Sequence, residues 1–343
     1  MTYARTLWLL LVCAALIRVG ALVGMPDSLA TDPDGYRAIA ENIVEHGVFG
    51  HDRSPTAYRP PAYPLLLTPC VAVGAGTRLA IGALHVLLGL ATVAMTFSLA
   101  SRAGMGRGLA ALAAGLVAAD PILLMQSTLV MSETLAAALA VLVILLLDRC
   151  TRRPTSGKAL LCGAALGMLA MCRPGLLAFA GMAVMALLWT GLFSRSHAKR
   201  STKSENEKEG RGRSPGTWQV CVGLVVGLGV VVAPWIVRNQ IAMGRPKVTT
   251  THGGYTLLLG NNPFFYDYLQ STPWFGAWQA DPFHAWWREI LAAERLIEPD
   301  GPSERLVFRG PEAELQADAL AYRYAFRTIR QQPGTFMWSC VVR

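Results

Sequence analysis

Apolar residues are gathered into long blocks separated by polar connections, instead of recurring at amphipathic spacing along the chain. Most blocks are about 17–22 residues long, which lets a helix cross a hydrocarbon core of about 30 Å. The predicted fold is therefore an all-α polytopic membrane protein. Its predicted spans, about seven in number, are Leu7–Gly24, Leu79–Leu99, Gly108–Leu124, Leu129–Leu147, Ala159–Met171, Leu176–Phe193 and Trp218–Ile236.

Two of these blocks leave an alternative open. The first block also fits a cleaved signal peptide, but Arg18 interrupts it and several apolar blocks follow, which favours an uncleaved helix. The block Ala159–Met171 is short for a span, so its flanks could extend it or it could lie partly buried.

Composition supports a membrane protein. Hydrophobic residues make up 53% of the 343 residues and charged residues only 15%, whereas a soluble protein is about one quarter charged. The net charge of +9 would suggest nucleic-acid binding in a soluble protein. No basic stripe interleaved with aromatic residues is present, so no nucleic-acid partner is expected. The seven cysteines form no CxxC pair, which argues against a zinc or disulfide framework.

Lysine and arginine are concentrated on alternate connections between the predicted spans. If the N-terminus is cytoplasmic, the inside connections hold most of them, while the outside loop from Met25 to Thr77 holds only Arg37, Arg53 and Arg59. This is the positive-inside asymmetry. It predicts a multi-pass protein of the plasma (inner) membrane with a cytoplasmic N-terminus.

The same pattern divides the chain into regions. Residues 1–238 are the predicted transmembrane module, with a first outer loop at 25–77 and a polar, basic cytoplasmic linker at 194–216. Residues 239–334 are predicted to be a small extracytoplasmic segment that ends with a helix. Residues 335–343 are expected to begin a truncated eighth helix.

Aromatic residues and one histidine within the helices have competing interpretations. The tryptophans of the extracytoplasmic segment are an interfacial belt, a small core or a platform for an acceptor; they are Trp274, Trp278, Trp286 and Trp287. His85 lies on an apolar helix and is interpreted as a packed core histidine. The predicted outer helix covers Glu312–Gln331.

The first outer loop carries the candidate chemistry. The run TDPDGY at 31–36 precedes the amphipathic segment Arg37–His46, which predicts a helix at the membrane interface. Asp32 or Asp34 could cap that helix. Capping accounts for one of the two carboxylates, and it does not explain why a second acid is present at the same place.

Later in this loop, Arg59 precedes two prolines in the run YRPPAYP at 58–64. The prolines stiffen the backbone and fix the height of the arginine near the interface. An arginine there either snorkels to lipid headgroups or binds a phosphate through charge-assisted hydrogen bonds. Carboxylates and such an arginine on one loop suggest a lipid-phosphate donor beside a general base.

These motifs resemble the first outer loop of GT-C glycosyltransferases, in the branch of protein-mannosyltransferase-like (family 39-like) and aminoarabinose-transferase-like enzymes. Such enzymes are polytopic and take a sugar from a polyprenyl-phosphate carrier. The resemblance implies that Asp32 is the catalytic aspartate and that Arg59 holds the donor phosphate. Some relatives have a second acid where this chain has Pro33, and others have a metal-binding glutamate where it has Tyr58. Both departures put a bound metal in doubt.

The remaining candidates lie near predicted span ends. Asp120 and Glu133 flank the turn between the third and fourth spans, where an acid is either a helix cap or a functional group. The resemblance implies the functional group for Glu133. Arg173 is either a helix stop or a second phosphate contact, and Arg238 either a headgroup anchor or a donor-facing residue. The substrate or acceptor side adds Tyr63 and Asn261.

The predicted activity is an inverting transfer of a sugar. Asp32 would take the proton of an acceptor hydroxyl, Asp34 would help to place the substrates, and Arg59 would hold the departing phosphate. The expected partners are a polyprenyl-phosphate sugar donor, a glycan, lipid or protein acceptor, and membrane lipids. A transporter or flippase of a lipid-linked or small solute is the alternative, and a noncatalytic scaffold is a third interpretation. No cofactor is assigned, and a divalent metal is left open.

Overall fold

The computed structural model of the protein describes residues 2–179, 181–182, 185, 217–272, 276–298 and 306–342. It is 77% helical, and the strands in these residues are β1 (Gly50–His51) and β2 (Ser54–Pro55), which pair antiparallel. The prediction of an all-α fold is confirmed. The contacts divide the chain into two compact units, the first formed by Met1–Val44 with Pro60–Trp235 and the second by Glu45–Arg59 with Ile236–Arg343.

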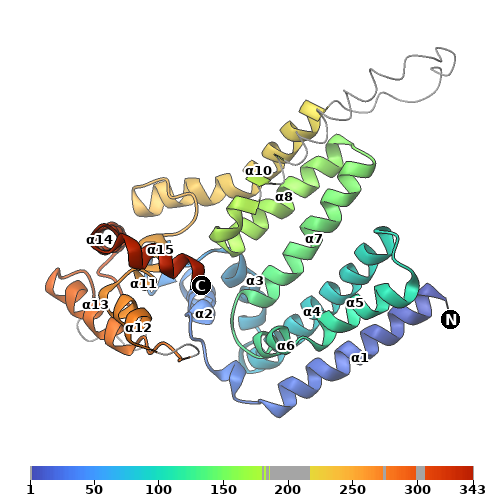
Figure 1. Ribbon diagram of the computed structural model, residues 1–343, viewed down its shortest axis with the longest axis horizontal. Coiled ribbons are helices and arrows are strands. Elements are labelled where there is room, and N and C mark those ends of the chain that lie inside the picture. Colours follow the sequence, from blue (N-terminus) through green and yellow to red (C-terminus); the bar gives the residue numbers. More distant parts are fainter. Residues whose placement is uncertain are drawn as a thin grey trace. The chain divides into compact units, whose positions relative to one another are not determined.

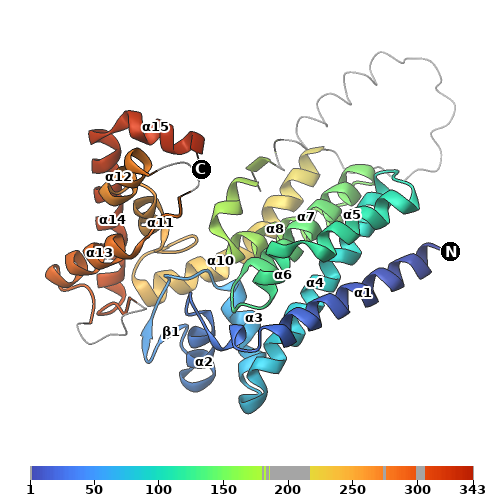
Figure 2. The ribbon, with the colours of Figure 1, turned by 60° about the horizontal axis from the view of Figure 1, so that its bottom comes forward.

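The first unit is a bundle of long apolar helices (Figures 1 and 2). Within it α4 packs against α1, α5 and α7, and α7 packs against α8. Alanines form much of the core between α1, α4 and α5, so these helices approach one another closely. The helices are α1 (Tyr3–Gly24), α2 (Tyr36–His46), α3 (Ala62–Val71), α4 (Thr77–Arg102), α5 (Arg107–Ala119), α6 (Pro121–Ser127), α7 (Glu133–Arg152), α8 (Ser156–Cys172) and the larger part of α10 (Thr217–Met243).

The number of membrane spans is only partly supported. Among the described residues, α1, α4, α7 and α10 are long and apolar enough to cross a membrane, and the bent pair α5–α6 would make a fifth. Helix α8 has 17 residues and falls below that length. The predicted span Leu176–Phe193 lies mostly outside the described residues, as does the linker 194–216. The prediction of seven spans is therefore not confirmed.

The predicted third span, Gly108–Leu124, is not one continuous helix. It breaks between α5 and α6, which meet at 49°. Pro121 has no N–H to continue the hydrogen bonds of α5. Asp120 adopts an extended backbone instead, and its side chain accepts a hydrogen bond from Leu123 N at 2.8 Å to begin α6. The predicted fourth span corresponds to α7, which begins at Glu133 instead of Leu129, after an irregular turn.

Glycines allow α8 and α10 to pack with their backbones in contact. A Cβ added to Gly163 of α8 would lie 2.0 Å from Leu224 O of α10, and one added to Gly227 of α10 would lie 2.1 Å from Leu160 O of α8. Small residues four apart on both helices permit this approach in a membrane, where the hydrophobic effect does not hold helices together. The short helix α8 is thereby fixed against a long one.

The second unit contains shorter helices and the segment Glu45–Arg59, which carries β1 and β2. Helix α14 packs against α11 and α15, and α12 packs against α13 and α15. The predicted helix Glu312–Gln331 is confirmed as α14. The helices are α11 (Gly253–Leu259), α12 (Pro263–Ser271), α13 (Asp281–Ala293), α14 (Pro311–Gln331) and α15 (Pro333–Val342).

Tryptophans of the second unit belong to its core. Trp287 is 3% exposed, and Trp278 and Trp286 pack against the same cluster of buried residues. The ring of Trp286 meets that of Tyr324 on α14 edge to face, with centroids 5.5 Å apart. The structure thus supports the small core among the three interpretations. Trp274 lies outside the described residues.

Candidate active site

Asp32 is buried at the beginning of α2 in the first unit, with 7% of its surface exposed. Its Oδ2 accepts a hydrogen bond from Ala38 N at 3.0 Å, and its carbonyl accepts one from Gly35 N at 3.1 Å. Gly35 has φ 74°, a conformation that glycine adopts without strain. The carboxylate therefore caps α2 by accepting from one of the backbone N–H groups of its first turn. Asp34 is half-buried beside it in sequence.

Tyr63 of α3 is fully buried and holds a hydrogen-bonded chain together. Its ring meets that of Tyr36 edge to face, with centroids 5.3 Å apart. Its hydroxyl lies 2.8 Å from His85 Nε2, and His85 Nδ1 lies 2.8 Å from Ser127 O. A carbonyl only accepts, so Nδ1 carries the hydrogen and Nε2 accepts from Tyr63. His85 is buried, as predicted, and links Tyr63 of α3 to the last residue of α6.

Three predicted site residues lie near helix beginnings of the first unit. Asp32 precedes α2, Tyr63 is in the first turn of α3, and Glu133 begins α7. Burial raises the pKa of the Tyr63 hydroxyl, and the charges of Asp32 and Glu133 raise it further.

Glu133 also pairs with Arg173. Arg173 ends α8 as its C-cap residue, which supports the helix-stop interpretation. Its Nη1 lies 2.6 Å from Glu133 Oε1. The other oxygen, Glu133 Oε2, is buried and accepts no hydrogen bond from the described part of the chain. This oxygen can accept a hydrogen bond from a substrate hydroxyl.

The Glu133–Arg173 pair is expected to matter more for activity than for stability. The side chains are 24% and 46% exposed, and such pairs contribute about 1 kcal/mol or less. Glu133→Gln should therefore change the free energy of unfolding by less than about 1 kcal/mol while lowering sugar transfer. Thermal unfolding and a transfer assay measure the two effects. The matched control is Arg152→Gln, which breaks the exposed pair with Asp148. Equal activity of Glu133→Gln and the control would contradict this role.

Two other candidates have structural partners instead of facing an open site. Asp120 caps α6, so the capping alternative holds for its carboxylate. Asn261 is 3% exposed; its amide donates to Leu257 O at 2.8 Å and its Oδ1 accepts from Tyr266 at 3.0 Å. The side chain of Asn261 therefore fixes the junction of α11 and α12 in the second unit.

Arg59 and its neighbours form an aromatic group in the second unit. Its guanidinium carbon lies 5.3 Å from the centre of the Tyr58 ring, close enough for a cation–π contact. The Tyr58 ring meets His252 edge to face at 4.4 Å. Burial lowers the pKa of His252 to about 3, and the positive charge of Arg59 contributes to the shift. His252 is therefore neutral at physiological pH, and Arg59 is the cation of this group.

The pKa of His252 predicts a pH-dependent stability. The ordinary pKa is 6.5 and the folded value is about 3, so the unfolded chain takes up the proton first as the pH falls. The contribution of His252 is complete above about pH 6.5 and is lost as the pH falls towards about 3. We expect His252→Gln to weaken the dependence of the unfolding temperature on pH between 7 and 4. The exposed His284→Gln is the control. Identical slopes in wild type and His252→Gln would refute this.

Arg238, near the end of α10, binds the backbone of the segment Glu45–Arg59. Its Nη1 donates to Thr56 O at 2.7 Å, its Nη2 donates to Phe49 O at 2.6 Å, and its guanidinium lies over the Phe49 ring. These contacts give Arg238 a structural role, and its two predicted roles, headgroup anchor and donor-facing residue, stay predictions. The sequence pattern could not reveal them because the partners lie 182 and 189 residues away.

The sequence analysis gave no structural or functional role to the buried charged residues Arg18 and Glu314. Arg18 of α1 is 2% exposed and donates to Ala118 O at 3.3 Å, close to the end of α5. Gly89 of α4 makes room for it, since a Cβ there would lie 2.1 Å from Arg18 Nε. Glu314 of α14 is 3% exposed, and burial raises its pKa although three hydrogen bonds oppose the shift. An acid on the alanine-rich face of a predicted helix was the available signal for Glu314.

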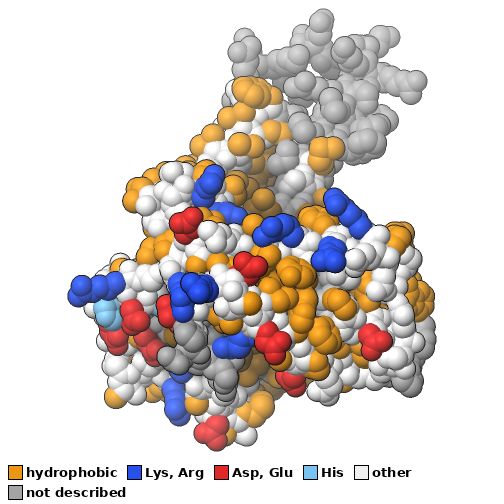
Figure 3. All heavy atoms as spheres, turned by 90° about the vertical axis from the view of Figure 1, so that its left-hand side faces the viewer, with side chains coloured by type: hydrophobic (Ala, Val, Ile, Leu, Met, Phe, Trp, Pro, Cys, Tyr) orange, Lys and Arg blue, Asp and Glu red, His pale blue; other side chains and the backbone are white. Residues whose placement is uncertain are grey.

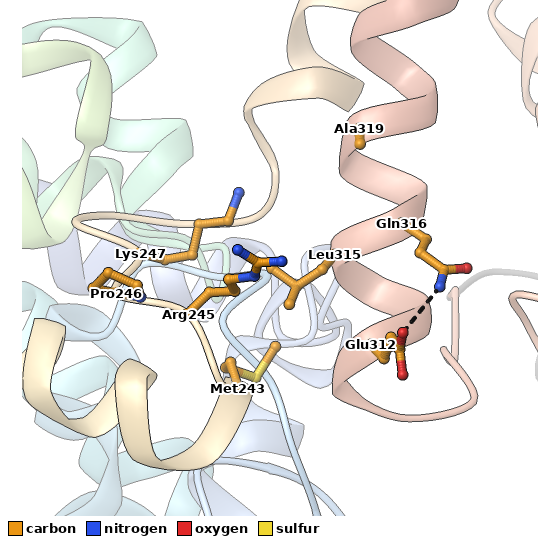
Figure 4. A pocket seen from close by; sticks show the side chains of 8 residues that line it. All are labelled: Met243, Arg245, Pro246, Lys247, Glu312, Leu315, Gln316 and Ala319. Atoms are coloured by element: carbon orange, nitrogen blue, oxygen red, sulfur yellow. Dashed lines mark hydrogen bonds between the residues drawn. The ribbon is translucent and has the colours of Figure 1, made fainter.

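The second unit also has an open cavity of about 680 Å³ between α14 and the loop that follows α10 (Figure 4). The loop contributes Arg245 and Lys247, and α14 contributes Glu312 and Gln316, which hydrogen bond at 3.3 Å. The face of the molecule in Figure 3 likewise mixes acidic and basic side chains with apolar ones. None of the predicted site residues lines this cavity.

In the described part of the chain, no three or more His, Cys, Asp or Glu side chains are grouped to hold a metal ion. The site residues are instead divided between the units: Asp32, Asp34, Tyr63, Asp120, Glu133 and Arg173 in the first, and Arg59, Arg238 and Asn261 in the second.

A known protein family matches part of the chain. The family model described as dolichyl-phosphate-mannose-protein mannosyltransferase matches residues 72–242. This range includes Glu133, Arg173 and Arg238, whereas Asp32 and Arg59 precede it. No curated protein matches the chain. The match confirms the resemblance to GT-C enzymes: residues 72–242 are a domain of the dolichyl-phosphate-mannose-protein mannosyltransferase family, in an integral membrane protein of the glycosyltransferase class.

Proposed function

We propose that the protein transfers a sugar from a polyprenyl-phosphate donor to an acceptor hydroxyl at the outer face of the plasma (inner) membrane. The family supports a lipid-linked donor, whose tail stays in the bilayer and so requires a membrane enzyme. The observation that carries the mechanism is the buried Asp32 carboxylate, held at the beginning of α2 by its hydrogen bond from Ala38 N.

The reaction is an inverting displacement at the anomeric carbon. The oxygen of the acceptor hydroxyl forms a bond to the anomeric carbon, and Asp32 takes the proton of that hydroxyl. The bond from the carbon to the phosphate oxygen breaks, and its electron pair leaves with the polyprenyl phosphate. Arg59 stabilises the negative charge that develops on this phosphate.

The other predicted residues support these two. Glu133 Oε2, buried and without a hydrogen-bond partner in the described residues, accepts a hydrogen bond from a sugar or acceptor hydroxyl. Asp34 assists in placing the substrates. Arg173 pairs with Glu133, and Arg238 donates to the segment that leads to Arg59. Both arginines therefore act by holding other site residues and not by binding the donor phosphate themselves.

The experiment is a transfer assay on membranes that contain the protein. Membranes are incubated with a panel of polyprenyl-phosphate sugars, each labelled in the sugar. We expect the label to leave the lipid fraction for at least one donor and to enter a glycan, lipid or protein product. Movement of the intact labelled lipid across proteoliposomes without sugar transfer would instead support a flippase.

A further inference from the structure

Glu314 of α14 binds two separate segments of the second unit. Its Oε2 accepts a hydrogen bond from Thr56 Oγ1 at 2.5 Å, and its Oε1 accepts from Ala57 N at 2.9 Å and from the hydroxyl of Thr251. The carboxylate is 3% exposed. Removing a buried acceptor of this kind leaves its donors unsatisfied, which costs more than the bonds themselves contribute.

The backbone around Thr56 and Ala57 is fully hydrogen-bonded. Thr56 N donates to Phe49 O at 3.0 Å, and Thr56 O accepts from Arg238. Ala57 N donates to Glu314, and Ala57 O accepts from Thr251 N at 3.0 Å. All four backbone N–H and C=O groups of these two residues are therefore hydrogen-bonded, and Glu314 accepts the bond from Ala57 N.

Arg59 follows this fixed segment by two residues. Tyr58 N donates to Thr56 Oγ1 at 3.0 Å, so the same threonine hydroxyl that donates to Glu314 also orients the next peptide. Pro60 follows Arg59 and restricts its backbone to extended conformations. Arg59 thus lies between a segment held by Glu314 and a proline.

We propose that Glu314 is a positioning residue for the donor phosphate, and that it acts by holding Thr56 and Ala57 so that Arg59 presents its guanidinium in one place. This inference rests on the proposed function for the role of Arg59. The pinning of the loop, by which we mean the hydrogen bonds of Glu314 to Thr56 and Ala57, does not depend on that function. Glu314, far from Arg59 in the sequence, thereby contributes to recognition of the donor.

Hydrogen exchange of the loop tests the pinning directly. In wild-type protein in nanodiscs, we expect slow exchange of the Ala57 and Tyr58 amides. Glu314→Ala should speed their exchange by about tenfold or more, and Glu314→Gln should restore most of the protection because its amide oxygen still accepts. Asp318→Asn is the matched control, since Asp318 lies one turn further on α14 and binds Lys247 and Gly254 instead. Unchanged exchange in Glu314→Ala would overturn the inference.

Binding of polyprenyl phosphate, with no sugar attached, tests the link to Arg59. We expect Glu314→Ala to weaken binding by about tenfold and Glu314→Gln by less. The double variant Glu314→Ala, Arg59→Ala should bind no more weakly than Arg59→Ala alone, because Glu314 acts through Arg59. Additive losses would overturn the positioning role. If wild type binds no polyprenyl phosphate while the exchange results hold, the proposed function fails and the pinning stands.

Discussion

Asp32→Asn is expected to lower the rate of sugar transfer by about 100-fold or more, which is the usual contribution of a general base. Asparagine keeps a side-chain oxygen that can accept the hydrogen bond from Ala38 N, and it caps helices as well as aspartate does. It lacks a carboxylate that can take the proton of the acceptor. The loss should therefore appear in transfer and not in folding.

The measurement is transfer of labelled sugar by wild type and variant at equal amounts of folded protein in the membrane. Thermal unfolding should be unchanged within the effect of a cap, about 1 kcal/mol or less. Asp27→Asn is the control, because Asp27 is an exposed acid of the same loop. Full activity of Asp32→Asn would remove Asp32 as the base and leave it as a helix cap only.

Arg59→Ala is expected to reduce kcat/KM for the lipid-linked donor by about 100-fold or more, as the loss of a charge-stabilising donor does in other enzymes. Arg59→Lys should retain part of the activity, since it keeps the charge but not the planar, two-pronged donor. His252 cannot replace the cation in Arg59→Ala, because burial, the larger cause of its shift, still holds its pKa below the ordinary value.

Donor kinetics with Arg53→Ala as the control measure this effect. Arg53 is an exposed arginine of the same loop, so its loss removes a surface charge without removing the proposed phosphate contact. If Arg59 acted only through a general electrostatic attraction to the membrane, Arg59→Ala and Arg53→Ala would lower kcat/KM equally. Such a result would contradict a specific role for Arg59.

Local sequence patterns predicted the parts of the fold that depend on neighbouring residues. The periodicity of 37–46 gave α2, and the acids before it gave the cap that Asp32 provides. The break at Asp120–Pro121 was also readable, since an N-cap residue followed by proline begins a helix. The sequence analysis nevertheless predicted one span, because it followed the continuous apolar block, and hydropathy says nothing about which backbone hydrogen bonds form.

Contacts between distant residues were beyond the sequence interpretation. Glu314 binds Thr56 at a separation of 258 residues, and Arg238 binds the same residue at a separation of 182. Nothing in the spacing of these residues shows that α10 and α14 meet one loop. The sequence analysis treated Glu314 as an ordinary helix residue and gave Arg238 a role at the membrane surface or the donor. Their hydrogen bonds to the segment Glu45–Arg59 are seen only in the folded second unit.

The most direct test of lipid-linked sugar transfer uses purified protein in nanodiscs, where movement between two compartments cannot occur. A donor labelled separately in the sugar and in the polyprenyl phosphate is supplied together with an extract of the cell envelope as acceptor. The account predicts that wild type releases polyprenyl phosphate in an amount equal to the sugar that reaches the acceptor, and that Asp32→Asn releases almost none. Donor that stays intact with wild type, across the whole panel of sugars, would contradict it.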